Sequence, residues 1–234
     1  MDLLAPQFWL AGLEIIVINI LLSGDNAVVI ALACRNLPEK QRRWGVIWGA
    51  LGAIVLRIIL TFFAVALLEL PYLKLLGGAL LVWIGVKLIA EDEGEGEDIV
   101  ASDRMLAAVK TVIVADLVMS IDNVLGVAAA AKGSLLLLIF GLVVSVPLVI
   151  GGAQIIMRLI ERMPILIVAG GGLLGFVAGE MVVEDPATAH WVEATGKWLH
   201  WAIPVIGILL VVGIAKWIEH RRGERPARNV DAGS

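Results

Sequence analysis

Residues 8–33 read FWLAGLEIIVINILLSGDNAVVIALA, an apolar stretch in which Glu14 and Asp25 are the only charged side chains. It is longer than the roughly 20 residues that an α-helix needs to cross a bilayer's hydrocarbon core. No Lys or Arg precedes it, and it is too long for a signal peptide. The stretch therefore predicts a transmembrane helix that carries acidic side chains at bilayer depth.

The rest of the chain has the same character. Hydrophobic residues make up 60% of the 234 residues, only 17% are charged, and the mean hydropathy is +0.95. A water-soluble domain needs more polar surface than this, and the strand alternation of a membrane β-barrel is absent. The sequence therefore predicts an all-α membrane protein with seven transmembrane helices. These spans are expected at residues 8–33, 44–68, 72–90, 105–131, 134–157, 164–183 and 199–218.

Basic residues follow the first, fifth and seventh predicted spans, whereas the loops on the other side hold only Lys74, Lys132 and Lys197. The positive-inside rule then places the N-terminus outside and the C-terminus in the cytosol of a bacterial inner membrane. Tryptophans near the span ends are expected to act as interfacial anchors. They are Trp9, Trp44, Trp191, Trp198, Trp201 and Trp217.

The chain also repeats itself. NILLSGDN at residues 19–26 matches DLVMSIDN at residues 116–123, and GGALL at residues 77–81 matches GGGLL at residues 170–174. Three spans per copy is an odd number, so the second copy is expected to be inverted in the membrane, as in many transporters. The predicted parts are a first repeat (8–90), an acidic cytosolic linker (91–104), a second repeat (105–183), an external loop (184–198), a seventh helix (199–218) and a basic cytosolic tail (219–234).

Carboxylates at bilayer depth are costly and usually functional. The helical rise of 1.5 Å per residue sorts these side chains into two levels, with Asp116 between them near the midplane. The outer level is expected to hold Glu14, Asp122 and Asn123, and the inner level Asp25, Asn26 and Thr111. Arg57 also lies mid-span, where it either neutralises one acid when no cation is bound or forms a static ion pair.

Carboxylate, amide and hydroxyl oxygens suit hard cations such as Mg²⁺, Ca²⁺ or Mn²⁺, whereas zinc and copper sites usually recruit Cys or His. The single cysteine, Cys34, lies at a helix end, and the histidines lie outside the repeats. No nucleophile–base pair, zinc-protease motif or phosphate loop predicts an enzyme, and no cofactor is expected. The expected partners are the lipid bilayer and a divalent metal ion rather than nucleic acid, with a homo-oligomer left open.

The doubled Ser-x-Asp-Asn segments, Glu14 upstream and the glycine-rich third spans resemble the TerC family of integral membrane proteins. The shorter YjbE/YkoY-like branch, within the LysE-type transporter superfamily, is most similar. This resemblance implies metal-ion transport, most often manganese export. It implies a functional set of Glu14, Asp25, Asn26, Asp116, Asp122 and Asn123.

Three functional hypotheses follow. The first is a secondary exporter of a divalent cation, coupled to proton exchange. Asp116 is then the predicted proton carrier, because its repeat partner Asn19 cannot titrate. The second is an exporter of an amino acid or another organic cation. The third is a non-transporting scaffold for membrane-protein assembly, in which the acids form only helix–helix hydrogen bonds.

Overall fold

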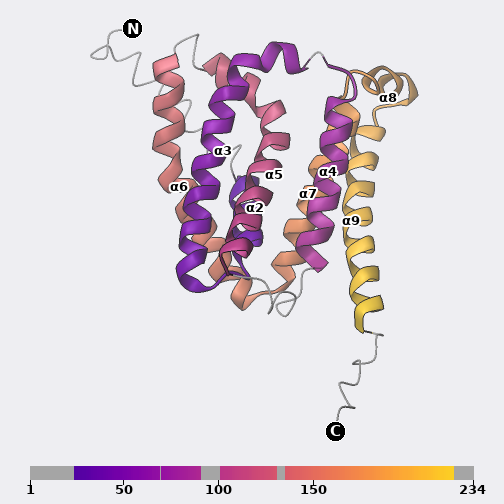
Figure 1. Ribbon diagram of the computed structural model, residues 1–234. Coiled ribbons are helices and arrows are strands. Elements are labelled where there is room, and N and C mark those ends of the chain that lie inside the picture. The colour runs from indigo at the N-terminus through magenta and orange to yellow at the C-terminus, as the bar shows by residue number, and fades with distance from the viewer. Residues whose placement is uncertain (1–23, 69, 91–100, 131–134, 224–234) are drawn as a thin grey trace.

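The computed structural model describes residues 24–68, 70–90, 101–130 and 135–223, and every regular element in these ranges is an α-helix. The helices form an elongated bundle in which most of them run nearly the full length (Figure 1). The elements are α2 (Gly24–Cys34), α3 (Glu39–Leu68), α4 (Leu73–Ala90), α5 (Ala101–Ala130), α6 (Leu135–Arg162), α7 (Ile165–Glu184), α8 (Ala189–Thr195) and α9 (Leu199–Gly223). The predicted all-helical class is confirmed.

Five of the described helices are long and apolar enough to cross a membrane. They are α3, α4, α6, α7 and α9. Of the first predicted span, the structure describes only residues 24–33, within the 11-residue helix α2. Helix α5 has 30 residues but carries Asp103, Arg104, Lys110 and Asp116. The count of seven spans therefore remains a prediction.

The outer surface of the bundle is apolar. Helix α3 exposes Val55 and Ile59, and helix α9 exposes Ile206 and Leu209, each by about half of its area or more. Such continuous apolar surface is typical of a protein that contacts lipid. Five of the six predicted anchor tryptophans are exposed, and Trp9 lies outside the described residues.

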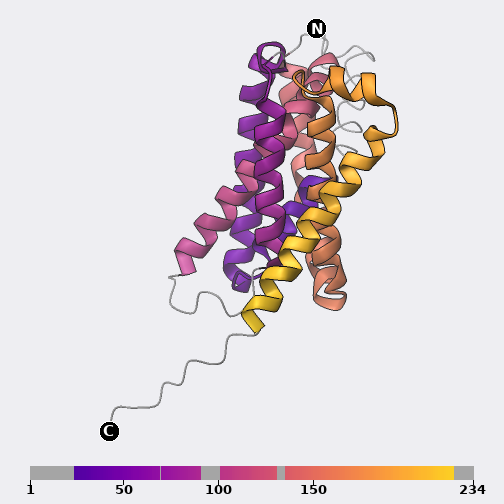
Figure 2. The same ribbon diagram turned by 90° about the vertical axis from the view of Figure 1, so that its right-hand side faces the viewer.

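Helix α2 lies inside the bundle, between α5 and α6 (Figures 1 and 2). Its side chains are buried on nearly every face, including Ile30, Ala31 and Leu32. A helix that is apolar all round is stable only when neighbours surround it. Any polar side chain on α2 is therefore held away from the lipid and within the protein.

Helices α4 and α7 pack antiparallel with their backbones close together. A Cβ atom added at Gly78 would lie 2.9 Å from the carbonyl oxygen of Ala178, and one at Gly85 would lie 3.1 Å from that of Gly171. Small residues permit this close approach in membrane helices. Helix α3 packs mainly on α5, and α6 packs mainly on α2. Helices of the two sequence copies therefore interlock.

Helix α9 lies against α7 through another glycine contact. A Cβ atom at Gly207 would lie 2.0 Å from the carbonyl oxygen of Gly175, and one at Gly179 would lie 2.4 Å from the Cα atom of Pro204. The backbones touch directly, so neither glycine tolerates a side chain without a shift of the helices. The seventh predicted span is thus fixed to the second copy.

The predicted external loop, residues 184–198, contains the short helix α8, which hydropathy does not detect because it has only seven residues. The buried carboxylate of Asp185 orders this region. It accepts backbone N–H groups from Tyr72 at 3.0 Å, Lys74 at 3.1 Å, Leu75 at 3.3 Å and Ala187 at 2.8 Å. These bonds join the start of α4 to the end of α7.

Two opposing effects act on Asp185. Burial by itself raises the pKa of this carboxyl, but the four N–H donors favour the charged form and hold the pKa below its ordinary value. The same bonds support Tyr72, whose φ of 69° is unusual for a residue with a side chain. Asp185 therefore acts as an N-terminal cap supplied from a distant part of the chain.

Candidate functional site

Arg57 on α3 and Asp116 on α5 meet inside the bundle. The guanidinium Nη2 donates to Asp116 Oδ1 at 2.6 Å, and Nε donates to Ser120 Oγ at 3.1 Å. The Ser120 hydroxyl in turn donates to Asp116 Oδ2 at 3.0 Å. Arg57 is 3% exposed, Asp116 4% and Ser120 0%. Both oxygens of the Asp116 carboxylate are therefore engaged in a buried, charge-assisted network.

Asp25 and Asn26 lie beside this network on α2, which packs against α5. Asp25 is close enough to Arg57 and Asp116 to interact electrostatically with both, attracted by the guanidinium and repelled by the carboxylate. One of its oxygens accepts the Asn26 backbone N–H at 2.8 Å. Asp25 and Asp116 therefore lie in one polar region of the structure.

The buried side chain of Asn26 has no hydrogen-bond partner in the part of the chain that the structure describes. It is 5% exposed, and neither its amide nitrogen nor its amide oxygen forms a hydrogen bond with any residue in the described ranges. Leaving a buried polar group unsatisfied costs about 1–3 kcal/mol. Such groups are few in folded proteins and call for an explanation. A role of the side-chain oxygen as a cation ligand is one such explanation.

Three other predicted ligands have side chains outside the described part of the structure. Glu14 lies outside the described residues. Asp122 and Asn123 belong to α5, two turns or less beyond Asp116, but their side chains lie outside the described part. Thr111, expected at the inner level, donates its hydroxyl to the Ala107 carbonyl within its own helix at 2.9 Å.

Sequence reasoning missed the part that Ser120 plays. Ser120 belongs to the repeated Ser-x-Asp-Asn motif, and it lies four residues after Asp116, so both side chains share one face of α5. That spacing is the signal that could have joined them. The partner of Arg57 could not be predicted, because it depends on how α3 packs against α5.

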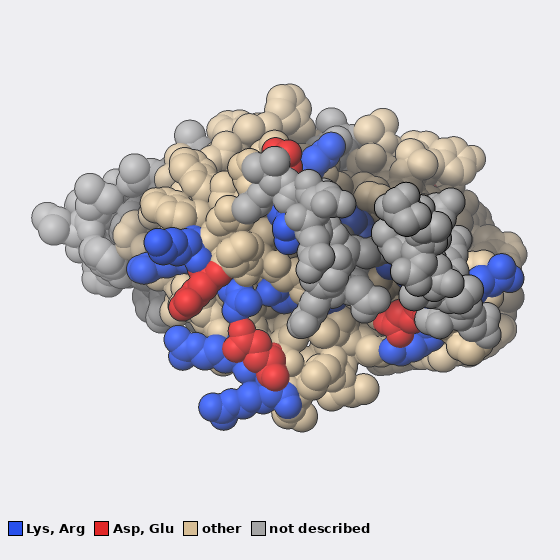
Figure 3. All heavy atoms as spheres, turned by 60° about the horizontal axis from the view of Figure 1, so that its bottom comes forward, with Lys and Arg blue, Asp and Glu red and all other residues tan. Residues whose placement is uncertain are grey.

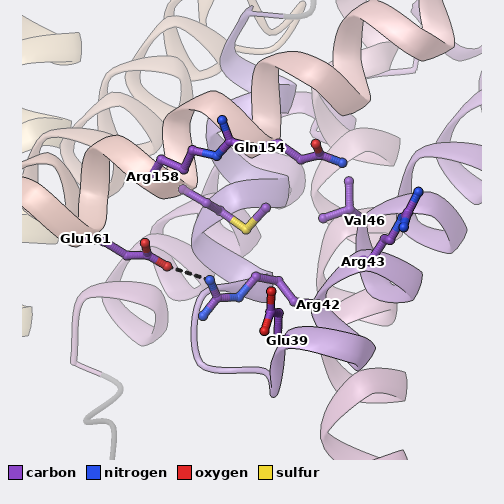
Figure 4. A pocket seen from close by; sticks show the side chains of 8 residues that line it. Glu39, Arg42, Arg43, Val46, Gln154, Arg158 and Glu161 are labelled. Atoms are coloured by element: carbon purple, nitrogen blue, oxygen red, sulfur yellow. Dashed lines mark hydrogen bonds and ion pairs between the residues drawn. The ribbon is translucent and has the colours of Figure 1, made fainter.

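A polar cavity of about 290 Å³ lies between α3 and α6 (Figure 4). Its polar lining consists of Glu39, Arg42, Arg43, Gln154, Arg158 and Glu161. Arg42 Nη1 and Glu161 Oε1 form an ion pair at 2.5 Å across it. Three arginines against two glutamates do not favour a cation, so this cavity is not the metal site.

The same end of the bundle is rich in basic side chains (Figure 3). We define the basic end as the end where α3 begins and where α6 and α9 finish, with Arg42, Arg158 and Arg221 among its cations. These three helices thus bring to one face the basic residues that the positive-inside rule assigns to the cytosol.

A smaller cavity of about 240 Å³ lies between α7 and α9 and is lined by Glu180, Glu184 and His200. Lys74 Nζ already pairs with Glu184 at 3.0 Å. Within the ranges that the structure describes, no three His, Cys, Asp or Glu side chains come together closely enough to hold a metal ion. The region of Asp25, Asn26 and Asp116 is the strongest candidate for a cation site, because it places two carboxylates near a buried amide that bonds to no described residue.

Known proteins are similar to this chain in sequence. The model of the family described as "Integral membrane protein TerC family" matches residues 4–223. The chain is 40% identical over 206 residues to the uncharacterized membrane protein YjbE of Bacillus subtilis, covering 88% of this chain and 94% of YjbE. It is 30% identical over 185 residues to YceF of the same organism, covering 75% of this chain and 72% of YceF.

A more distant relative is the inner membrane protein YgdQ of Escherichia coli, 26% identical over 197 residues, covering 77% of this chain and 83% of YgdQ. No solved structure matches. The family match spans nearly the whole chain, and the apolar helices, the doubled motif and the membrane relatives agree with it. This multi-pass membrane protein therefore belongs to the TerC family of integral membrane proteins.

Proposed function

We propose that this chain is a secondary transporter that exports a divalent metal cation, with Mn²⁺ as its main substrate. The observation that carries the proposal is the amide of Asn26, which bonds to no described residue and lies buried beside Asp25 and near Asp116. Two carboxylates and an amide oxygen offer the hard ligands that Mn²⁺, Mg²⁺ and Ca²⁺ prefer. The choice of manganese rests on the family resemblance. In this proposal the metal is cargo, and the protein is not an enzyme.

We propose an inverted-repeat architecture, with the basic end in the cytosol and the N-terminus outside. Its support is the reciprocal packing of α4 and α7. Gly78 approaches Ala178, the repeat counterpart of Gly85, while Gly85 approaches Gly171, the counterpart of Gly78. Such exchange of equivalent contacts is what a two-fold axis between copies produces. The candidate site then lies between the copies, where inverted-repeat transporters bind their substrates.

Proton exchange is proposed as the coupling mechanism, because several buried carboxylates cannot all remain charged when no cation is bound. The network around Asp116 changes the predicted carrier. Both of its oxygens are already engaged by Arg57 and Ser120, so neither is free to take up a proton, which argues against Asp116 in this role. Asp25 has no ion pair within the described residues and replaces it as the proposed carrier.

One observation favours the scaffold hypothesis instead. The contact of Arg57 with Asp116 joins α3 to α5, as a purely structural ion pair would do. This hypothesis explains Asp116 but leaves the Asn26 amide unexplained, since that group bonds to no described residue. For an organic cation, the described residues do form a roomier apolar cavity of about 570 Å³ between α3 and α5, with Trp48 in its lining. That lining contains no acidic side chain to pair with a cation, so the cavity does not favour this alternative.

Transport by the purified protein in liposomes tests the proposal. Mn²⁺, Mg²⁺, Ca²⁺ and Zn²⁺ are offered one at a time, with and without a pH gradient, and protein-free liposomes give the background. We expect manganese flux above background that a pH gradient accelerates. Absence of flux for every metal under both conditions contradicts the proposal and supports the scaffold.

A further inference from the structure

Arg57 places a permanent positive charge at the candidate site. Arginine does not lose its proton in proteins, so this charge can leave a carboxylate only if the side chain moves. In the structure the guanidinium holds Asp116 Oδ1 directly at 2.6 Å and reaches Oδ2 through Ser120. A metal ion that uses Asp116 as a ligand therefore has to displace the Arg57 guanidinium from this carboxylate.

We propose that Arg57 is a tethered cation that competes with the transported metal for the Asp116 carboxylate. This inference rests on the function proposed above and concerns how that site is regulated. When the metal binds, the guanidinium gives up its contact with Asp116. When the metal leaves, the guanidinium returns and neutralises the carboxylate. Arg57 thus limits how tightly the metal is held and promotes its release.

Charge at the site supports a preference for divalent ions. Once Asp25 has released the proton that the proposed exchange gives it, Asp25 and Asp116 contribute two negative charges among the described residues, and Arg57 contributes one positive charge. A divalent ion that displaces Arg57 from Asp116 faces two free carboxylates and balances both. A monovalent ion balances only one of them, so it gains less from the exchange. The tethered guanidinium therefore favours Mn²⁺ over Na⁺ or K⁺.

A static ion pair is the simpler explanation, but it explains less. Buried ion pairs are often no more stabilising than apolar side chains of similar size, because both charges lose their hydration. Charged side chains within membrane helices usually mark a transport path. Arg57 also interacts electrostatically with Asp25 on α2. An ion pair that only joined α3 to α5 would not need this second interaction.

Manganese binding to the purified protein in detergent, measured by calorimetry, tests the inference in four forms. They are the parent protein, Arg57→Gln, Asp116→Asn and the double variant. Glutamine removes the charge but keeps a side chain that can hydrogen-bond to Ser120. We expect Arg57→Gln to bind Mn²⁺ about tenfold more tightly than the parent, since directly contacting charged groups are strongly coupled. In the Asp116→Asn background the same change should alter affinity by less than about threefold.

Several results overturn the inference. One is that Arg57→Gln binds Mn²⁺ no more tightly than the parent. Another is that it tightens binding equally in both backgrounds, which would indicate a general field effect. If Arg57→Gln does not fold, Arg57→Lys replaces it. Lysine keeps the charge but lacks the guanidinium that contacts Asp116 and Ser120 together. The Arg57→Lys variant should therefore bind Mn²⁺ more tightly than the parent. Equal or weaker binding contradicts the inference. A parent protein that binds no divalent ion removes the proposed function itself, and this inference with it.

Discussion

Arg57 and Asp116 form an ion pair at 2.6 Å inside the helix bundle, with each side chain only 4% exposed. The pair joins α3 to α5, and Ser120 completes it. Beside this pair, on α2, the buried side-chain amide of Asn26 forms no hydrogen bond with a described residue, and Asp25 accepts only the Asn26 backbone N–H among them. The functional account rests on this contrast between the hydrogen-bonded network of Arg57, Asp116 and Ser120 and the neighbouring amide of Asn26.

Asn26 should matter for binding rather than for folding. Replacing it by leucine, which has the same branching and number of heavy atoms, removes a buried amide that bonds to no described residue, so the unfolding free energy should stay equal or rise by about 1–3 kcal/mol. Manganese affinity should fall about tenfold, because one oxygen ligand is lost. Thermal unfolding and calorimetry on the same preparation measure the two effects. A destabilised variant with unchanged affinity would show that the amide has a structural partner.

Asp185 should contribute to stability in a pH-dependent way. Asp185→Ala removes the acceptor of four backbone N–H groups and should lower the unfolding free energy by about 2 kcal/mol or more. Because the pKa of Asp185 is lower in the folded protein, its contribution is complete above the ordinary value of 3.8. It should disappear as the pH falls through the lower folded pKa.

Chemical unfolding of the parent and the variant in detergent at several pH values measures this difference. Glu184→Gln serves as the control, because Glu184 is half exposed and its pair with Lys74 should be worth less than about 1 kcal/mol. A gap between parent and Asp185→Ala that does not narrow in acid would contradict the assigned role.

The contact between α7 and α9 can be tested with a matched pair of glycines on one helix. Gly207→Ala places a methyl group against the Gly175 carbonyl oxygen and should destabilise the protein by about 1–3 kcal/mol. Gly213→Ala has no neighbour within 4 Å among the described residues and should be neutral or stabilise by about 0.5–1 kcal/mol. Equal effects on the melting temperature would show that α9 does not pack as described.

The proposed orientation predicts which residues are accessible from each side. Single cysteines at Lys40, Arg221 and Glu193 are introduced after Cys34→Ala, because Cys34 is the only native cysteine. Lys40→Cys and Arg221→Cys should react with an impermeant reagent only from the cytosol, and Glu193→Cys only from outside. Labelling of all three from one face is incompatible with the proposed topology.

Hydropathy located the helices but not their ends. The span expected from residue 44 begins in the structure at Glu39, and the span expected to end at residue 157 ends at Arg162. Charged residues continue these helices beyond their apolar segments. A hydropathy profile therefore marks the ends of the apolar segment rather than the ends of the hydrogen-bonded helix. Helix α8 has too few residues to give any such signal.

The sequence also predicted the buried acids better than their partners. Asp25 and Asp116 stand out because carboxylates are rare in apolar stretches. Whether Arg57 pairs with one of them, or with neither, depends on the rotation of α3 against α5, which no local pattern specifies. Asp185 was unpredictable for the same reason, because its donors at Tyr72, Lys74 and Leu75 lie far away in the chain.

Manganese flux through Asp25→Asn in proteoliposomes tests the central claim most directly. Asp25 is the acid of the candidate site that forms no ion pair with a described residue, and its amide analogue keeps the same shape. Glu193→Gln, an exposed acid on α8, is the matched control. The account predicts that the parent and Glu193→Gln transport Mn²⁺ at similar rates, while Asp25→Asn reconstitutes equally well and loses at least about tenfold in rate. Near-parental flux in folded Asp25→Asn would contradict the account.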